Sequence, residues 1–237
     1  MELYIQFGRS SPGDPASDAL RARAALLEQV IEEPFFERLR TKEQLGYTAH
    51  ASMRNSFGCV GFLFSIVSSK FDAHHVASRV YAFLAAFDIE RSIDEAAYAN
   101  HVSSLVSRKR EPFANLADEA NAHWATMYDA EYDFGRSLRE AEAVARISRA
   151  ELAAFYNAHV RPCARRCVFL DGSGAKAVEG DRRELLVVVA PKKGDASLDA
   201  ATLRSRMAGA CVDGSAVLSP DHVDGDAHAY GCGLPRW

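Results

Sequence analysis

The sequence predicts an α+β fold in which several helices cover one face of an antiparallel sheet, in two layers. Three observations indicate this fold. A strand-like alternation opens the chain, two adjoining strand-like segments follow a helix, and helical spacing then prevails over a long stretch. Strands and helices do not alternate one for one, as they would in a parallel α/β sheet. The chain has 237 residues, of which 48% are hydrophobic and 25% charged, as is typical of a globular protein with a core.

A strand and a helix open the chain. Over residues 2–7 apolar and polar side chains alternate, which is the period-two pattern of a half-buried strand. From Ser17 onward apolar side chains recur at helical spacing, with charged residues between them. Pro34 should kink or reset this helix, because proline has no backbone N–H to donate.

A hairpin follows this helix. Tyr47 begins a second strand directly after Gly46, and residues 59–68 have the nearly continuous apolar pattern of a central strand. Between them, residues 55–58 include Asn, Ser and Gly, which favour turns. The two segments therefore predict an antiparallel hairpin.

Helix-capping patterns divide the middle of the chain into several helices. Asp72 can cap a first helix, and a capping box at residues 92–95 predicts a second helix that runs toward Arg110. Pro112 suits the first turn of a third helix. A second capping box, formed by Ser148 with Glu151, predicts a fourth.

The last third of the chain differs in composition. Residues 166–170 have the pattern of a returning strand, and residues 184–189 that of a further one. Gly, Asp, Ala and Ser dominate from Pro191 onward, with few large apolar residues. We therefore predict one domain over residues 1–175, and a poorly ordered or peripheral tail over residues 176–237 that holds the strand at 184–189.

Charge and hydropathy exclude several classes of partner. The formal net charge is −4, so no overall basic field predicts nucleic-acid binding. No apolar run approaches the ~20 residues that a membrane helix needs, and the first residues do not have the pattern of a secretory signal. We accordingly expect no nucleic acid and no membrane as partners. The expected compartment is the cytoplasm, with an organelle matrix as the alternative.

The cysteines, the histidines and the common catalytic motifs give no sign of a metal site or a catalytic site in this sequence. The five cysteines are scattered and form no Cys-x-x-Cys pair, so we interpret them as reduced thiols, with a disulfide or a zinc site as the lesser alternative. None of the eight histidines belongs to a zinc motif, and no nucleophile elbow, Walker loop or dinucleotide fingerprint is present. The basic run at residues 108–110 is interpreted as a solvated helix end, with a polyanion contact as the alternative.

One segment concentrates polar chemistry at a junction between helix and strand. Residues 40–47, RTKEQLGY, include the guanidinium of Arg40 and the phenol of Tyr47. Both groups can donate hydrogen bonds to a carbonyl or an oxyanion at neutral pH, and neither is a ready base. They therefore suit an anchoring or charge-stabilising pair. The alternative is an ordinary surface helix end followed by an ordinary strand tyrosine.

The same run resembles a segment in the C-terminal half of the insulinase, or pitrilysin-type, zinc metallopeptidases, the family of insulin-degrading enzyme. The first strand, the EEPFFERLR sequence before the run and the SRVYAFL sequence at residues 78–84 are similar to that family as well. The resemblance extends over residues 2–170. It implies the fourth, C-terminal domain of an enzyme built from four similar α+β domains that close into a chamber around a peptide.

The resemblance also implies a division of labour. Arg40 and Tyr47 would contact the substrate carbonyl and stabilise the tetrahedral intermediate. Zinc and the general-base glutamate would lie in a separate N-terminal domain, so this chain would hold no cofactor or metal and would be inactive alone. Its partners would be the zinc-bearing N-terminal half and the peptide substrate. The alternative is a non-catalytic scaffold module of the same fold, which binds a peptide or partner without cleavage.

Overall fold

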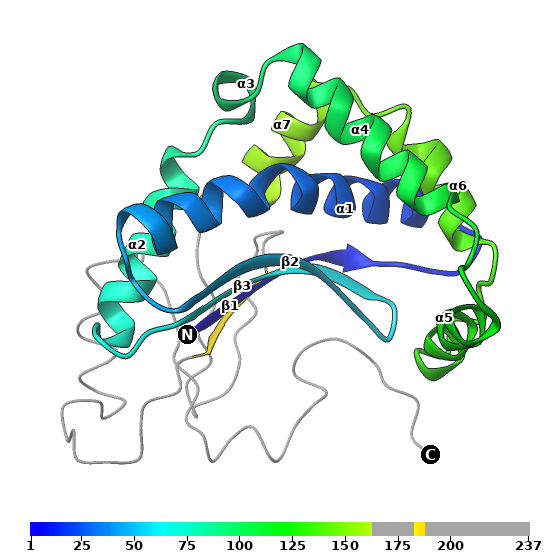
Figure 1. Cartoon of the computed structure of the whole chain (residues 1–237), viewed down its shortest axis with the longest axis horizontal. Coiled ribbons are helices and arrows are strands. Elements are labelled where there is room, and N and C mark those ends of the chain that lie inside the picture. The colour runs from blue at the N-terminus through cyan, green and yellow to red at the C-terminus, as the bar shows by residue number, and fades with distance from the viewer. Residues whose placement is uncertain (163–182, 188–237) are drawn as a thin grey trace.

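A computed structural model describes residues 1–162 and 183–187 (Figure 1). Four strands form one sheet in the order β2-β3-β1-β4, and every pair of neighbours is antiparallel. The strands are β1 (Glu2–Arg9), β2 (Thr48–Ser56), β3 (Cys59–Val67) and β4 (Arg183–Val187). The helices lie over one face of this sheet (Figure 1), which confirms the predicted α+β fold.

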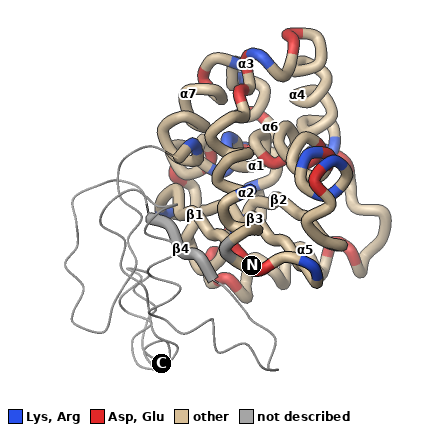
Figure 2. Tube along the Cα trace, turned by 90° about the vertical axis from the view of Figure 1, so that its left-hand side faces the viewer, with Lys and Arg blue, Asp and Glu red and all other residues tan. Residues whose placement is uncertain are grey.

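The helical layer is built around its first helix. The helices are α1 (Pro15–Phe36), the π-helix η1 (Glu37–Lys42), α2 (Ala73–Ala86), α3 (Ile89–Ser92), α4 (Glu95–Arg110), α5 (Leu116–Tyr128), α6 (Arg136–Val144) and α7 (Arg149–His159). Helix α1 lies directly on the sheet and contacts α4, α6 and α7 on its other side, while α2 and α5 lie at opposite ends (Figure 1). Figure 2 shows that Lys and Arg are interspersed with Asp and Glu along the helices.

The core lies between the sheet and α1. Alternation along β1 buries Leu3 and Ile5 completely, as the period-two pattern predicts. Helix α1 supplies Leu27 and Ile31 to the same core, and β3 supplies Phe62. Among the described residues, no helix has the length and apolar character needed to cross a membrane.

The capping predictions were confirmed at two helices and wrong at two. The side chain of Asp72 accepts a hydrogen bond from His75 N in α2, and that of Ser148 accepts one from Glu151 N in α7. Helix α4, however, is capped by Asp94, because Ser92 is the last residue of the short helix α3. Helix α5 likewise starts only after its cap Asn115, beyond Pro112.

Pro34 does not end its helix. Helix α1 continues through Pro34 to Phe36, and the chain then becomes π-helical from Glu37. The helix is therefore not reset at Pro34 itself, and the change of helix type comes three residues later. This change brings the chain to the junction with β2.

Several predictions fall wholly or partly outside the described residues. The strand expected at residues 166–170 and most of the tail at 176–237 lie there, and so does the boundary at 175. The strand expected at 184–189 corresponds to β4, which pairs with β1. Cys59 is disulfide-bonded, so the interpretation of all five cysteines as reduced thiols is wrong for this one; its partner lies outside the described residues.

A buried ion-pair network holds α1 to the segment between α5 and α6. The Arg21 guanidinium donates to Glu131 over 2.5 Å, with side chains only 3% and 4% exposed. Arg136 donates to the other oxygen of Glu131. Nearby, Arg139 joins Asp18 of α1 to Asp133. These contacts fix the end of the molecule that carries α5.

We expect Glu131→Gln to destabilise the protein by about 3–5 kcal/mol, because it leaves Arg21 buried and without its compensating charge. The free energy of unfolding in urea measures this loss. Glu142→Gln is the matched control, since Glu142 pairs with Arg146 at the surface over 3.9 Å, and it should change stability by less than about 0.5 kcal/mol. Equal stability of the two variants would contradict a structural role for the network.

Candidate functional site

The RTKEQLGY run forms the turn that leads from η1 into β2. Leu39 and Leu45 are buried on the two sides of this turn, and Leu45 N donates to Leu39 O over 3.0 Å. Between them, Gln44 has a φ of 51°, in the left-handed region that non-glycine residues seldom adopt. The two apolar side chains hold the turn in the core, so the polar residues around them face outward.

Gly46 brings the turn into contact with the end of β3. A Cβ atom at Gly46 would lie 2.0 Å from Val67 O, so only glycine fits here without a backbone shift. Directly after it, Tyr47 N donates to the same carbonyl over 3.1 Å. The start of β2, and therefore the direction of the Tyr47 side chain, follows from this close approach.

Glu43 joins the turn to helix α2. Its carboxylate accepts two hydrogen bonds from Arg79, over 2.7 and 2.8 Å, and a third from Arg38 over 2.6 Å. The hydrogen bonds from Arg79, and then the one from Arg38, hold the pKa of Glu43 below its ordinary value despite partial burial. Sequence reasoning missed Arg79 as a partner, although the SRVYAFL segment that contains it was part of the resemblance.

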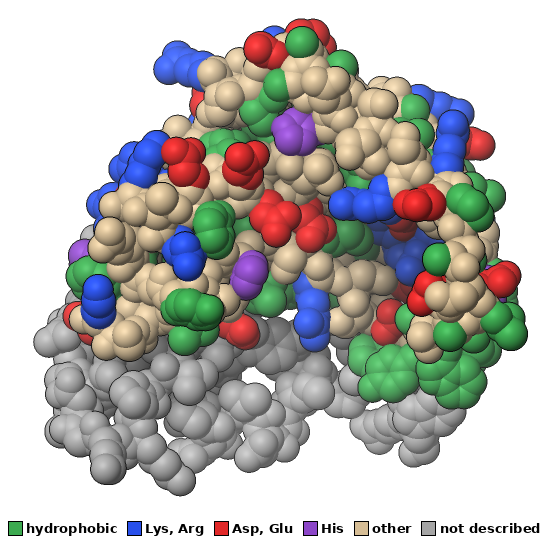
Figure 3. All heavy atoms as spheres, in the orientation of Figure 1, with side chains coloured by type: hydrophobic (Ala, Val, Ile, Leu, Met, Phe, Trp, Pro, Cys, Tyr) green, Lys and Arg blue, Asp and Glu red, His purple; other side chains and the backbone are tan. Residues whose placement is uncertain are grey.

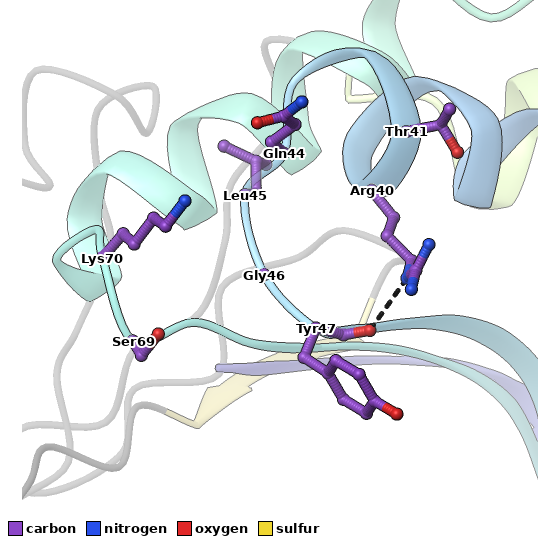
Figure 4. Close-up of a pocket in the computed structure, with 8 residues that line it drawn as sticks. All are labelled: Arg40, Thr41, Gln44, Leu45, Gly46, Tyr47, Ser69 and Lys70. Atoms are coloured by element: carbon purple, nitrogen blue, oxygen red, sulfur yellow. Dashed lines mark hydrogen bonds between the residues drawn. The ribbon is translucent and has the colours of Figure 1, made fainter.

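Arg40 and Tyr47 lie together at one open hollow of about 450 Å³. The described residues that line this hollow include two cations and no carboxylate: Arg40, Thr41, Gln44, Leu45, Gly46, Tyr47, Ser69 and Lys70. Figure 4 shows Arg40 extending from η1 toward the carbonyl of Tyr47, with Lys70 on the opposite side. The structure thus brings together the two residues that the sequence singled out.

The two donors are available to a ligand. Arg40 Nε donates to Tyr47 O over 3.0 Å, and within residues 1–162 and 183–187 no carboxylate pairs with this guanidinium. The Tyr47 side chain is 85% exposed. Such an arrangement can donate hydrogen bonds to a carbonyl, a carboxylate or an oxyanion, and it offers no base at the described lining.

The described residues do not supply a zinc site. Nowhere among them do three His, Cys, Asp or Glu side chains gather closely enough to hold a metal ion. In the basic run, Lys109 is already paired, since its amine lies 2.6 Å from Glu140 of α6.

Comparison with known sequences relates the chain to peptidases. A family profile described as PQQ synthase PqqF-like, C-terminal lobe domain 4, matches residues 26–124. A nardilysin-like protein of Arabidopsis thaliana is 33% identical over 170 residues, which are 70% of this chain and 16% of that protein. Human insulin-degrading enzyme is 34% identical over 159 residues, 66% of this chain and 15% of the enzyme. The chain spans about a sixth of the length of these relatives.

Solved structures show the same fold. Pitrilysin matches with a TM-score of 0.55 at 19% identity, over 67% of this chain and 17% of that one. The periplasmic protease PqqL of Escherichia coli matches with a TM-score of 0.50 at 13% identity, over 66% of this chain and 18% of that one. Fold and relatives together define a peptidase-type α+β domain.

The chain belongs to the insulinase family and corresponds to the C-terminal domain of its members. This confirms the resemblance that the sequence predicted.

Gly46→Ala should destabilise the protein by about 1–3 kcal/mol or more, because its Cβ would overlap the Val67 carbonyl. Unfolding in urea measures the change. Gly135→Ala is the control: its φ is −92°, and its nearest neighbour would be a side-chain atom of Arg139, at 3.2 Å, and not a backbone atom. This control should cost less than about 1 kcal/mol. A Gly46→Ala variant as stable as the control would refute the steric argument.

The stabilisation by Glu43 should depend on pH. The pKa of Glu43 is lower in the folded protein than in the unfolded chain, where it is about 4.3. The ionised carboxylate therefore adds to the free energy of unfolding at pH values above the unfolded pKa. This stabilisation is lost as the pH falls through the folded pKa. Glu43→Gln should therefore destabilise by about 1–2 kcal/mol at pH 7, and the difference from wild type should close toward pH 3. Urea unfolding at both pH values tests this. Glu37→Gln, which affects an exposed pair with Lys42, should show little difference at either pH.

Proposed function

We propose that this chain acts as the C-terminal domain of an insulysin-like zinc metallopeptidase and supplies two hydrogen-bond donors to the scissile carbonyl. The observation that carries the proposal is the joint position of Arg40 and Tyr47 at one open hollow, with the Arg40 Cζ atom 5.8 Å from the Tyr47 ring centroid. Zinc, which activates water for hydrolysis when bound, is assigned with the general base to a separate N-terminal domain.

The donors suit the charge that develops during peptide hydrolysis. Attack on a peptide carbonyl puts negative charge on its oxygen, and a guanidinium and a phenol can both donate to that oxygen. Neither group needs to move a proton to do so. Their strength depends on the exclusion of water, and Tyr47 is 85% exposed in the isolated domain. The donors therefore need a partner surface that covers the hollow.

The greater length of the relatives supports the proposed partner. The chain covers about a sixth of the length of a nardilysin-like protein and of human insulin-degrading enzyme, so these relatives contain much more than the part that it matches. We propose the zinc-bearing N-terminal half as the partner and a peptide as the substrate, with the domain over residues 1–175 as the interacting unit. The chain alone should not hydrolyse peptides. We propose the cytoplasm as the compartment in which the protein acts.

A second candidate is a non-catalytic interaction module of the same fold. Helix α5 favours it, because Leu116, Trp124 and Tyr128 are 80%, 68% and 73% exposed along one helix. Figure 3 shows hydrophobic side chains gathered at the end of the molecule where α5 lies. Exposed apolar surface of this kind commonly marks a protein interface. A scaffold, however, has no need of the Arg40–Tyr47 pair.

Mixing the purified chain with a zinc-bearing N-terminal half of an insulysin-like peptidase should produce hydrolysis of a fluorogenic peptide. Arg40→Ala and Tyr47→Phe should each lower kcat by about 10²–10³, because each removes one donor to the oxyanion. Steady-state kinetics measure kcat and KM. Arg146→Ala and Tyr132→Phe are the controls, since both side chains are exposed and outside the hollow.

Two results would decide against catalysis. Full activity of both Arg40→Ala and Tyr47→Phe would remove the donor role. Peptide binding without hydrolysis, unchanged in the double variant, would favour the interaction module instead.

A further inference from the structure

Phe36 lies beside the candidate donor Arg40 without belonging to the core. It is the last residue of α1, one helical turn before Arg40, so the two side chains share a helix face. The Arg40 Cζ atom lies 5.0 Å from the Phe36 ring centroid, within the range of a cation–π contact. The Phe36 side chain remains 39% exposed.

The neighbouring phenylalanine shows that the core does not need Phe36. Phe35 is completely buried and packs against Phe64 and Phe83, with ring centroids 5.3 and 5.4 Å away. Consecutive residues on a helix point in different directions, so the pair has divided roles. Phe35 fills the interior, while Phe36 faces the guanidinium at the surface.

The Arg40 guanidinium is held from several sides. Its Nε donates to Tyr47 O over 3.0 Å, the Phe36 ring lies 5.0 Å from its Cζ, and the Tyr47 ring lies 5.8 Å away. Because Nε is used, the two terminal amino groups are the donors left for a ligand in the hollow. An arginine side chain has many rotamers, and each constraint reduces the number that it samples.

We propose that Phe36 is a positioning residue that holds the Arg40 guanidinium with its terminal amino groups directed to the hollow. The positioning of Arg40 by Phe36 is inferred from the contacts alone. The effect of Phe36 on hydrolysis rests on the proposed function. The Arg40 Cζ atom lies over the Phe36 ring, and an aliphatic side chain of similar volume cannot reproduce this cation–π contact.

The first test uses the full chain without a partner and observes Arg40 directly. In nitrogen-15 NMR, the Arg40 Nε–Hε signal, assigned by its loss in Arg40→Lys, should be shifted by the ring and should exchange slowly with water. Phe36→Leu should shift this signal and speed its exchange, while Phe36→Tyr should preserve both. Phe113→Leu, which changes another exposed phenylalanine, is the control.

Unchanged shift and exchange in Phe36→Leu would overturn the positioning role. Urea unfolding of the same variant, with a midpoint close to wild type, shows that the protein is folded.

The second test measures hydrolysis in the mixture with the N-terminal half. Phe36→Leu should lower kcat by about two- to five-fold with little change in KM, and Phe36→Tyr should restore it. In an Arg40→Ala background, Phe36→Leu should have no further effect, because Phe36 acts through Arg40. An equal loss in both backgrounds would overturn the proposal.

The two proposals fail separately. Full activity of Arg40→Ala would remove the donor function, and the NMR result would still decide whether Phe36 positions the guanidinium.

Discussion

The backbone of Gly46 lies so close to the Val67 carbonyl that no side chain fits between them. That carbonyl also accepts the N–H of Tyr47, so a single acceptor at the end of β3 determines where β2 begins. The position of the Tyr47 carbonyl, which accepts from Arg40, follows from the same point. The hollow, the direction of the phenol and the orientation of the guanidinium all depend on this one backbone contact. Buried leucines and the Glu43–Arg79 pair keep the turn in place around it.

Much of the fold was predictable because its signals are local. Alternation along β1 and the turn between β2 and β3 depend on neighbours in sequence, although the turn occupies residues 57–58 and not 55–58, and the Ser148 cap is equally local. The wrong cap at Ser92 has a local cause as well. Ser92 and Asp94 are both suitable N-cap residues and lie two positions apart, but Ser92 is taken up as the last residue of α3, so Asp94 caps α4.

The candidate site was predictable in part. Arg40 and Tyr47 stood out by their chemistry, but their shared hollow arises from a π-helix and a left-handed residue, which no periodicity indicates. The partner of Glu43 lies on α2, thirty-six positions further along the chain, and pairing over that distance has no local signal. The contact between Phe36 and Arg40 has helical spacing, but the sequence alone does not show which of the adjacent Phe35 and Phe36 is buried.

The place of β1 in the sheet has a consequence for synthesis of the protein. β1 comes first in the chain but lies inside the sheet, where Glu2 pairs with Ser65 of β3 on one side and with Val187 of β4 on the other. A nascent chain can pair β1 with β3 and cover them with α1 long before β4 leaves the ribosome. During that interval one side of β1 presents unpaired backbone groups, which other strands can recognise. Only the pairing of β4 with β1 removes this exposed edge.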